Sequence, residues 1–384
     1  MEVIIKFLRN IILVIFLLLG QSLNAEEKIQ IGLLAPFSGE NSQIGRSLIQ
    51  SVRMGINKID KSSLIIIPAD TGSNPEQTLK VVNDLYAQGV KIFIGPIFNE
   101  NIIKLNQFKD AIFLSLTNKV LNNPKNVISV GINAESQFQA IKKFLNKNEL
   151  KETLVLIPRK EFQEEIEAGI KKSKFKTKKI FYYSAEPTKL TKQIEKVTKY
   201  AIRKQNLNDE IKRIEMSDDP NKEKKIQNLE KRDTLGRIGF DSIVIADFDE
   251  SLKSVTTSLL YTDVSPKNIT FISLNQWFDE SLFKERTSQP ISFPSINLSN
   301  YKSFNEEYKK LFEIEPSQIA ILSYDLIGLI YYSLVQNDFE VNNKLFLKKN
   351  KFKGISGIFE INQNNINHTL HFYTVRDSNF IKVF

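Results

Sequence analysis

The sequence predicts an α/β protein with two parallel-sheet lobes, and three observations support this expectation. Short apolar runs alternate with stretches of helical periodicity through the first 130 residues. The same alternation restarts near residue 153, after a stretch at residues 131–135 that indicates a crossing between two units. The chain has 384 residues, more than the roughly 250–300 at which a single hydrophobic core stops growing. We therefore expect two doubly wound parallel sheets, each covered by helices.

The first lobe is predicted from five short apolar strands with helices between them. Residues 92–94 form an apolar run without polar alternation, which is typical of a parallel strand that is buried on both faces. Gly95 and the proline after it end this strand, and Asn99 or Glu100 is expected to cap a helix that follows. Asn74, Pro75 and Gln77 have the pattern of a helix N-terminus. The predicted strands lie at residues 28–35, 64–67, 92–94, 111–115 and 127–130.

The second lobe is predicted from four strands, a charged helical insertion and a β-rich tail. Residues 188–231 contain no glycine and are highly charged, and they are expected to form two helices that are broken near Pro220. This helical hairpin is either a partner surface or a solvated arm. Strands are expected at residues 153–157, 179–184, 241–247 and 269–273, and in the tail at residues 355–361, 369–375 and 380–384.

The N-terminus has the pattern of a secretory signal peptide. Lys6 and Arg9 precede an uncharged apolar run at residues 11–19, which is too short to span a bilayer comfortably. Cleavage is expected after Ala25, and an uncleaved anchor is the alternative; N-terminal sequencing of the exported protein separates the two. No later stretch is long and apolar enough for a membrane helix, so the mature chain is expected in a periplasm.

The composition argues against several classes of protein. The chain has no cysteine, so the sequence predicts neither disulfides nor the lipid attachment of a lipoprotein. A formal net charge of +9 is compatible with anionic partners such as cell-wall polymers or anionic lipid. Lysines are interleaved with glutamates, however, as at residues 302–315, which is more typical of a solvated surface. No nucleic-acid partner is expected for an exported protein.

The sequence contains no credible catalytic or metal-binding set. His368 and His371 are the only histidines, and their odd spacing on one predicted strand places them on opposite faces, as surface or packing residues. No G-x-S-x-G, Walker or G-x-G-x-x-G motif follows the predicted strands. Asp247 and Asp249 lie at a strand end, where capping is as good an explanation as catalysis. We therefore expect neither an enzyme nor a cofactor or metal.

Polar side chains follow the predicted strands of both lobes at their carboxyl ends. Open α/β sheets bind ligands at this edge. Taken singly, each of these residues is better explained as a cap or a turn, but their shared placement predicts a cleft for a small polar molecule if the two sheets face each other. The candidate ligand-binding residues are Ser38, Asn99, Ser115, Thr117 and Asn118 in the first lobe, and Phe248, Asn275 and Gln276 in the second.

Several segments of the chain resemble the leucine-binding family of type I periplasmic binding proteins. They are IGLLAPFSG at residues 31–39, PADTGSNPEQT at 68–78, GVKIFIGPIFNEN at 89–101 and FLSLTN at 113–118, together with Gly45. Within this family, the sequence is similar to the penicillin-binding protein activators in particular. The helical hairpin, RDTLGRIGFDSIVIAD at residues 232–247, the pair Gln276-Trp277 and SYDLIGL at residues 323–329 carry that closer likeness.

The resemblance implies two α/β lobes that are joined by three crossings and bind a ligand between them. In amino-acid binders of this family, a serine at the position of Asn99 holds the ligand carboxylate, with help from the region of Ser115 to Thr117. An acidic residue of the second lobe holds the ammonium group, but the corresponding positions here, Asn275 or Gln276, are uncharged. The first lobe would comprise residues 26–131 and 295–338, and the second residues 132–294 and 339–384.

The sequence leaves two functional hypotheses. The first is an exported solute-binding protein that closes on a small polar ligand, such as an amino acid, and delivers it to an ABC-type transporter permease. The second is a regulator of peptidoglycan synthesis that acts by contact with a penicillin-binding protein. Both depend on one geometric expectation, that Asn99 and Gln276 lie on opposite sides of the same gap.

Overall fold

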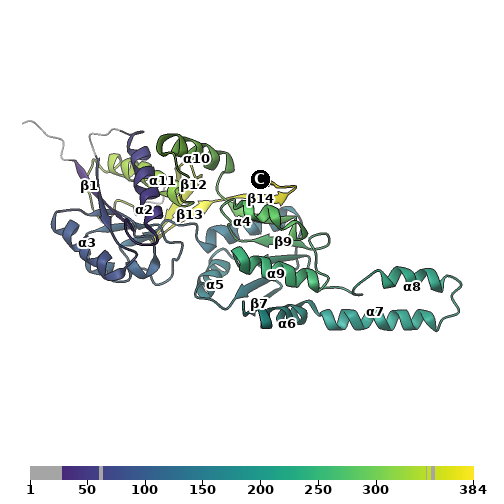
Figure 1. Cartoon of the computed structure of the whole chain (residues 1–384). Coiled ribbons are helices and arrows are strands. Elements are labelled where there is room, and N and C mark those ends of the chain that lie inside the picture. Colours follow the sequence, from purple (N-terminus) through teal and green to yellow (C-terminus); the bar gives the residue numbers. More distant parts are fainter. Residues whose placement is uncertain (1–27, 60–63, 343, 347–350) are drawn as a thin grey trace, which may run out of the picture.

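The computed structural model describes residues 28–59, 64–342, 344–346 and 351–384. Two α/β lobes lie side by side, and a pair of helices projects from the side of the second lobe that faces away from the first (Figure 1). Within the described ranges, no helix combines the length and the apolar character needed to cross a membrane. The predicted signal peptide, with its cleavage point after Ala25, lies outside the described residues.

The first lobe is built on an eight-stranded sheet in the order β11-β12-β13-β5-β4-β3-β1-β2. Its central strands β1 to β5 are parallel, and β3 is completely buried, as its uninterrupted apolar sequence predicts. The strands are β1 (Ile29–Ala35), β2 (Leu64–Asp70), β3 (Ile92–Ile94), β4 (Ile112–Ser115), β5 (Val127–Ser129), β11 (Lys351–Lys353), β12 (Ile358–Asn362) and β13 (Asn365–Thr369). The helices are α2 (Ser42–Ile56), α3 (Pro75–Ala87), α10 (Leu298–Phe312) and α11 (Ala320–Val335), with 3-10 helices η1 (Asn99–Ile102) and η2 (Leu105–Gln107).

The two helix starts predicted in the first lobe have different outcomes. Asn74 caps α3 as expected, because its Oδ1 accepts from the N–H groups of Glu76 at 2.9 Å and Gln77 at 3.0 Å. The segment after Asn99, by contrast, forms only the short helices η1 and η2, and Asn99 makes no capping bond there. Ile103 is exposed, so this segment lacks a continuous apolar face that would hold a longer helix on the sheet.

The second lobe is built on a seven-stranded sheet in the order β15-β14-β10-β9-β8-β6-β7. The strands β6 to β10 are parallel to their neighbours within this group, and β14 and β15 continue the sheet in antiparallel fashion. The strands are β6 (Thr153–Pro158), β7 (Lys179–Tyr183), β8 (Ser242–Ile245), β9 (Thr270–Ser273), β10 (Ile291–Ser295), β14 (His371–Arg376) and β15 (Asn379–Lys382). The helices are α4 (Ala134–Lys147), α5 (Gln163–Lys172), α6 (Pro187–Thr198) and α9 (Asp249–Tyr261), with η3 (Glu280–Lys284) and η4 (Arg286–Ser288).

Strand β10 has no counterpart among the predicted strands. It contains Pro294, and a proline in a short apolar run argues against a central strand. The structure accommodates this proline because β10 pairs with β9 only through Ile291 and Ser292, so Pro294 lies beyond the parallel ladder. On its other side, β10 pairs along its whole length with β14.

The C-terminal tail differs from the expectation that residues 339–384 all lie in the second lobe. Strands β11, β12 and β13 extend the first sheet, and only β14 and β15 join the second. Each part of the tail buries apolar side chains in the lobe that it joins. Phe359 and Ile366 are buried in the first lobe, and Phe372 is buried in the second. His368 and His371 therefore lie on two different strands in two sheets, which corrects their placement on a single strand.

The chain passes between the lobes three times, as the resemblance implies. The crossings connect β5 to α4, β10 to α10, and β13 to β14. All three lie next to the carboxyl end of a strand, so the hinge is continuous with the strand ends that line the space between the lobes.

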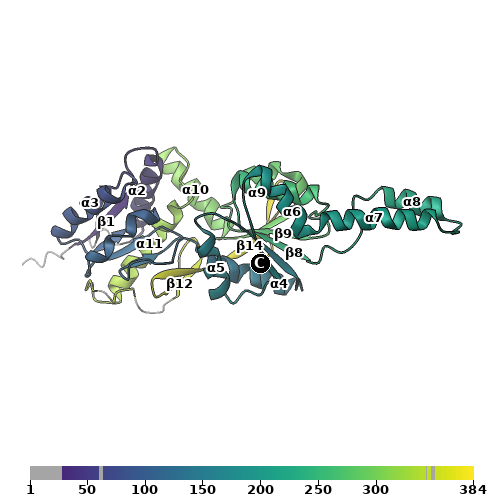
Figure 2. The same ribbon diagram turned by 90° about the horizontal axis from the view of Figure 1, so that it is seen from below.

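The helical insertion consists of three helices, not the predicted two. Helix α6 packs on α9 within the second lobe, with Leu190 and Ile194 buried. Lys199 adopts a left-handed conformation, with φ of 54°, and separates α6 from α7 (Tyr200–Glu215). Helices α7 and α8 (Lys222–Glu230) lie side by side and form the projecting arm (Figure 2), and α8 has no buried residue. Only residues 200–230 thus form an arm away from the lobe.

Candidate functional site

A cleft of about 480 Å³ lies between the two lobes. The first lobe contributes the loops after β3 and β4 and the N-terminal end of α11, and the second lobe contributes the loops after β8 and β9. Asn99 and Gln276 both line this cleft, so the predicted edges of the two sheets do converge on one space. This is the edge at which open α/β sheets bind ligands.

Most of the candidate ligand-binding residues line the cleft. Ser38 and Ser115 do not. Ser38 is exposed, and its backbone N–H donates to Asp70 Oδ1 at 3.3 Å. Ser115 is completely buried, and its Oγ donates to the carbonyl of Pro96 at 2.7 Å, so it supports the loop after β3. The residues that line the cleft are Asn99, Thr117, Asn118, Phe248, Asn275 and Gln276.

The carboxylate that follows β8 is enclosed behind the cleft wall. Asp247 accepts hydrogen bonds from Lys160 Nζ at 2.8 Å and from the hydroxyl of Tyr183 at 2.7 Å. Burial, together with Asp247 itself, raises the pKa of Tyr183, so this phenol remains protonated and donates. The Asp247 charge is therefore neutralised within the second lobe, and Asp247 is not among the cleft-lining residues.

Several cleft-lining residues are absent from the predicted set. Asp249 and Asp279 follow the ends of β8 and β9, and Glu100 is the neighbour of Asn99. The sequence would have indicated all three if more residues after each predicted strand had been considered as candidates. Gln318 lies just before α11 and Leu322 in its first turn, where the sequence offers no strand-end signal. They reach the cleft only because α11 packs on α2 in the first lobe.

A carboxylate of the second lobe also binds the loop of the first lobe that follows β4. Glu165, on α5, accepts from the backbone N–H of Val120 at 3.0 Å and from that of Leu121 at 2.8 Å. The same loop supplies Thr117 to Lys119 to the cleft wall. These two hydrogen bonds therefore connect the second lobe directly to the cleft-lining loop of the first lobe.

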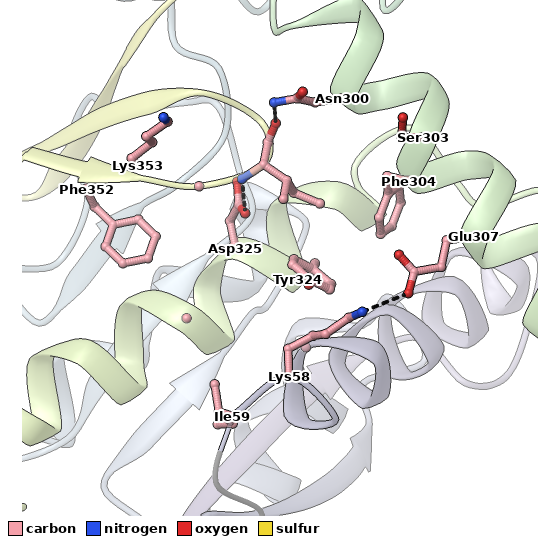
Figure 3. Close-up of a pocket in the computed structure, with 14 residues that line it drawn as sticks. Lys58, Ile59, Asn300, Ser303, Phe304, Glu307, Tyr324, Asp325, Phe352 and Lys353 are labelled. Carbon is pink, nitrogen blue, oxygen red and sulfur yellow. Dashed lines mark hydrogen bonds and ion pairs between the residues drawn. The ribbon is translucent and has the colours of Figure 1, made fainter.

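A second cavity, of about 500 Å³, lies within the first lobe between α2, α10, α11 and the loop after β11 (Figure 3). Asp325, from the SYDLIGL segment, accepts from the backbone N–H groups of Ile355 at 2.7 Å and Ser356 at 2.9 Å. Burial raises the pKa of Asp325 to about 6. Position 354 requires glycine, because a Cβ on Gly354 would lie 2.3 Å from the Asp325 carboxylate. Asp325 thus holds the loop that leads into β12.

The histidines do not form a metal site. His368 is buried, and its Nε2 donates to the carbonyl of Val130 at 2.8 Å. His371 lies in the second sheet, where its Nδ1 is 3.3 Å from the carbonyl of Phe384. Among the described residues, no three histidine or carboxylate side chains are grouped closely enough to hold a metal ion.

The comparisons with known proteins agree with this geometry. Residues 28–197 match the family model described as periplasmic binding protein. An uncharacterised protein of Rickettsia prowazekii (strain Madrid E) is 26% identical over 96 residues, which are 24% of this chain. The matched segment spans only 26% of that relative's length.

Solved structures match the chain over nearly its whole length. A putative branched-chain amino acid ABC transporter from Rhodospirillum rubrum is 11% identical, with a TM-score of 0.70, over 93% of this chain and 100% of that one. The C-domain of LpoA from Haemophilus influenzae, described as a regulator of PBP1A, is 14% identical, with a TM-score of 0.61, over 92% of this chain and 100% of that one. LivJ from Streptococcus pneumoniae, in complex with isoleucine, is 15% identical, with a TM-score of 0.57, over 93% of this chain and 99% of that one.

The fold is that of the type I periplasmic binding proteins, with two mainly parallel sheets, alternating helices and a cleft between the lobes. The resemblance to the leucine-binding family and to regulators of penicillin-binding proteins is confirmed, because the family model and these neighbours represent both groups. At identities below 25%, the structural neighbours establish the fold and leave the ligand and the partner to be proposed.

Proposed function

We propose that the protein is exported to the periplasm, where it binds a small polar solute between its lobes and delivers it to a membrane transporter. The observation that carries this proposal is the cleft itself, whose walls combine Asn99 and Thr117 of one lobe with Asn275 and Gln276 of the other. A ligand that contacts both walls stabilises the closed arrangement of the lobes. The function is one of binding, without a catalytic step.

A thermal-shift screen tests solute binding. Free amino acids, short peptides and sugars are each added at millimolar concentration, and the melting temperature is recorded. A solute present at about 100 times its Kd stabilises the folded state by about 2.7 kcal/mol, which raises the melting temperature measurably. The absence of any shift across the panel would contradict solute binding.

A second candidate function is regulation of a penicillin-binding protein by contact. Two observations support it, namely the arm formed by α7 and α8 and the likeness to the C-domain of LpoA, a regulator of PBP1A. The arm exposes apolar side chains that no core uses, among them Ile202 and Met216. An exposed amphipathic hairpin of this kind is suited to recognition by another protein.

The structure indicates how to remove the arm without disturbing the lobe. The backbone N–H of Leu235 donates to the carbonyl of Arg203 at 2.9 Å, so the two ends of the arm lie next to each other. A short glycine linker in place of residues 205–232 should therefore leave the lobe folded. We expect the whole chain, but not the shortened one, to retrieve a penicillin-binding protein from a membrane extract, with equal solute binding as the control. Failure of the whole chain to retrieve one would remove this candidate.

A further inference from the structure

Two neighbouring amide side chains lie in the wall of the cleft that belongs to the second lobe. Asn275 is 5% exposed and Gln276 is 7% exposed, and both line the cleft. A ligand that displaces water from a free donor or acceptor in the cleft must replace the lost hydrogen bond, so such a group indicates what the ligand should supply. The identity of the ligand therefore depends on which atom of each amide faces the cleft.

The orientation of the Asn275 amide follows from its partners. Its Oδ1 accepts from the backbone N–H of Trp277 at 3.1 Å and from the hydroxyl of Ser295 at 2.8 Å. A backbone N–H can only donate, so Oδ1 cannot exchange places with Nδ2. Among the described residues, Nδ2 has no hydrogen-bond partner and is not an enclosed atom, so it presents a donor at the cleft.

The orientation of the Gln276 amide is fixed in the opposite sense. Its Nε2 donates to the carbonyl of Leu274 at 3.2 Å and to that of Asp247 at 3.4 Å. Two carbonyl oxygens can only accept, so Nε2 must lie on that side. Within the part of the chain that the structure describes, Oε1 has no donor and is not enclosed, so it presents an acceptor at the cleft.

We infer that the cleft recognises a carboxamide. Asn275 Nδ2 would donate to the amide carbonyl of the ligand, and Gln276 Oε1 would accept from its N–H. A donor and an acceptor on adjacent residues match the C=O and N–H of one amide, as in a peptide or in an acetamido sugar. This inference rests on the proposed solute-binding function and specifies the chemical class of the solute.

The charges around the cleft favour an amide over a carboxylate. Glu100, Asp249 and Asp279 line the cleft, whereas Lys119 is the single cationic side chain among the described lining residues. A free carboxylate would be repelled by this set, while an amide carries no charge. Phe248 and Trp277 provide aromatic surface for an apolar part of the same ligand.

Matched ligands test the inference without any change to the protein. Leucinamide, leucine methyl ester and leucine share one side chain, but only the first carries both a carbonyl and an amide N–H. We expect leucinamide to bind at least tenfold more tightly than the ester and the free acid by calorimetry. N-acetylglucosamine and glucosamine form a second pair, which separates an acetamido sugar from a peptide amide as the source of the group.

A substitution on the protein provides the complementary test. Asn275→Asp keeps the acceptor for Trp277 and Ser295 but replaces the free donor with an oxygen, so the affinity for the amide ligand should fall at least tenfold. Asn268→Asp is the matched control, because it introduces the same change at an exposed residue before β9, outside the cleft. Circular dichroism and melting curves verify that both variants are folded.

The outcomes separate this inference from the proposed function. The inference is supported if each amide binds more tightly than the matched ester or amine. This preference should disappear in Asn275→Asp and remain in Asn268→Asp. If free leucine or another solute without an amide binds most tightly, the inference is overturned and solute binding stands. If no solute of any class binds, the proposed function fails and the inference fails with it.

Discussion

At the scale of single residues, buried polar side chains hold the crossings between the lobes together. Asn133 Nδ2 donates to the carbonyl of Ile366 at 2.8 Å, and Ser136 Oγ accepts from the backbone N–H of His368 at 2.9 Å. His368 Nε2 then donates back to the carbonyl of Val130. These hydrogen bonds connect the first crossing to strand β13, so the hinge is fixed by side-chain to backbone contacts.

Titration of His368 makes stability depend on pH. Burial lowers the pKa of His368 to about 4, whereas an unfolded histidine titrates near about 6.5. Its contribution to stability is therefore fully present above about pH 6.5 and is lost as the pH falls towards 4, by up to about 3 kcal/mol. We expect the melting temperature of His368→Gln to fall less between pH 7 and pH 4.5 than that of the wild type. Parallel pH profiles for the two proteins would contradict this assignment.

The contacts of Asp325 predict the effect of an isosteric change. Both carboxylate oxygens accept backbone N–H groups, from Ile355 and Ser356, so in Asp325→Asn one of these donors meets an amide nitrogen. We expect a destabilisation of about 1–3 kcal/mol, measured by urea unfolding. Asn300→Ala is the control, since it removes a single exposed hydrogen bond to the carbonyl of Ile355 in the same loop. Equal effects of the two substitutions would argue against a special role for Asp325.

At the scale of elements, the arm is anchored at its base by one buried cation. Arg203, on α7, is 3% exposed. Its Nε donates to the carbonyl of Thr198 at 3.1 Å. The other guanidinium nitrogens donate to the hydroxyl of Thr234 and to the carbonyl of Thr262. These partners lie in the α6–α7 junction, in the segment after α8 and at the end of α9. The guanidinium thus fixes the direction in which the arm leaves the lobe.

Loss of this anchor should loosen the arm. We expect Arg203→Met to destabilise the protein by about 3 kcal/mol, because three buried hydrogen-bond acceptors lose their partner. Amide hydrogen exchange should accelerate across α7 and α8 while the strands of the first lobe stay protected. Lys204→Met, at the exposed neighbouring position, is the matched control and should change neither quantity. Unchanged exchange in the Arg203 variant would contradict the anchoring role.

The elements that could be predicted from the sequence are those with a strong local pattern. The apolar run of β3 and the capping pattern at Asn74 were sufficient to locate a buried strand and the start of α3. Strand β10 was not predictable in this way, because Pro294 is tolerated only through its position beyond the ladder with β9. The division of the tail depends on which sheet each strand joins, which periodicity does not encode.

At the scale of the whole molecule, Glu165 links the two lobes beside the cleft. Glu165 lies in the second lobe, and the N–H groups of Val120 and Leu121 that it binds lie in the first. A change of the lobe angle must therefore separate these groups. The loop that carries these N–H groups also lines the cleft. We therefore expect solute binding and the lobe angle to be coupled through these hydrogen bonds.

A distance measurement tests this coupling. The chain has no cysteine, so Lys104→Cys in the first lobe and Lys267→Cys in the second provide the only thiols for spin labels. We expect a bound solute to narrow the distance distribution, and Glu165→Ala to broaden it in the absence of solute. Glu164→Ala, at the exposed neighbouring residue, should leave it unchanged. Identical distributions for the Glu165 variant and the wild type would contradict a coupling role.

Local patterns in the amino-acid sequence were sufficient to predict the alternation of strands and helices, the presence of two lobes and the strand ends that carry Asn99 and Gln276. These properties are local, since periodicity and the position of a residue at the end of a strand involve only neighbours in the chain. Three properties became visible only in the folded chain: which sheet each tail strand joins, that Gln318 reaches the cleft, and which atoms of Asn275 and Gln276 are left free at the cleft. Each of these depends on contacts with other segments of the chain, as between Asn275 and Ser295, that no local pattern contains.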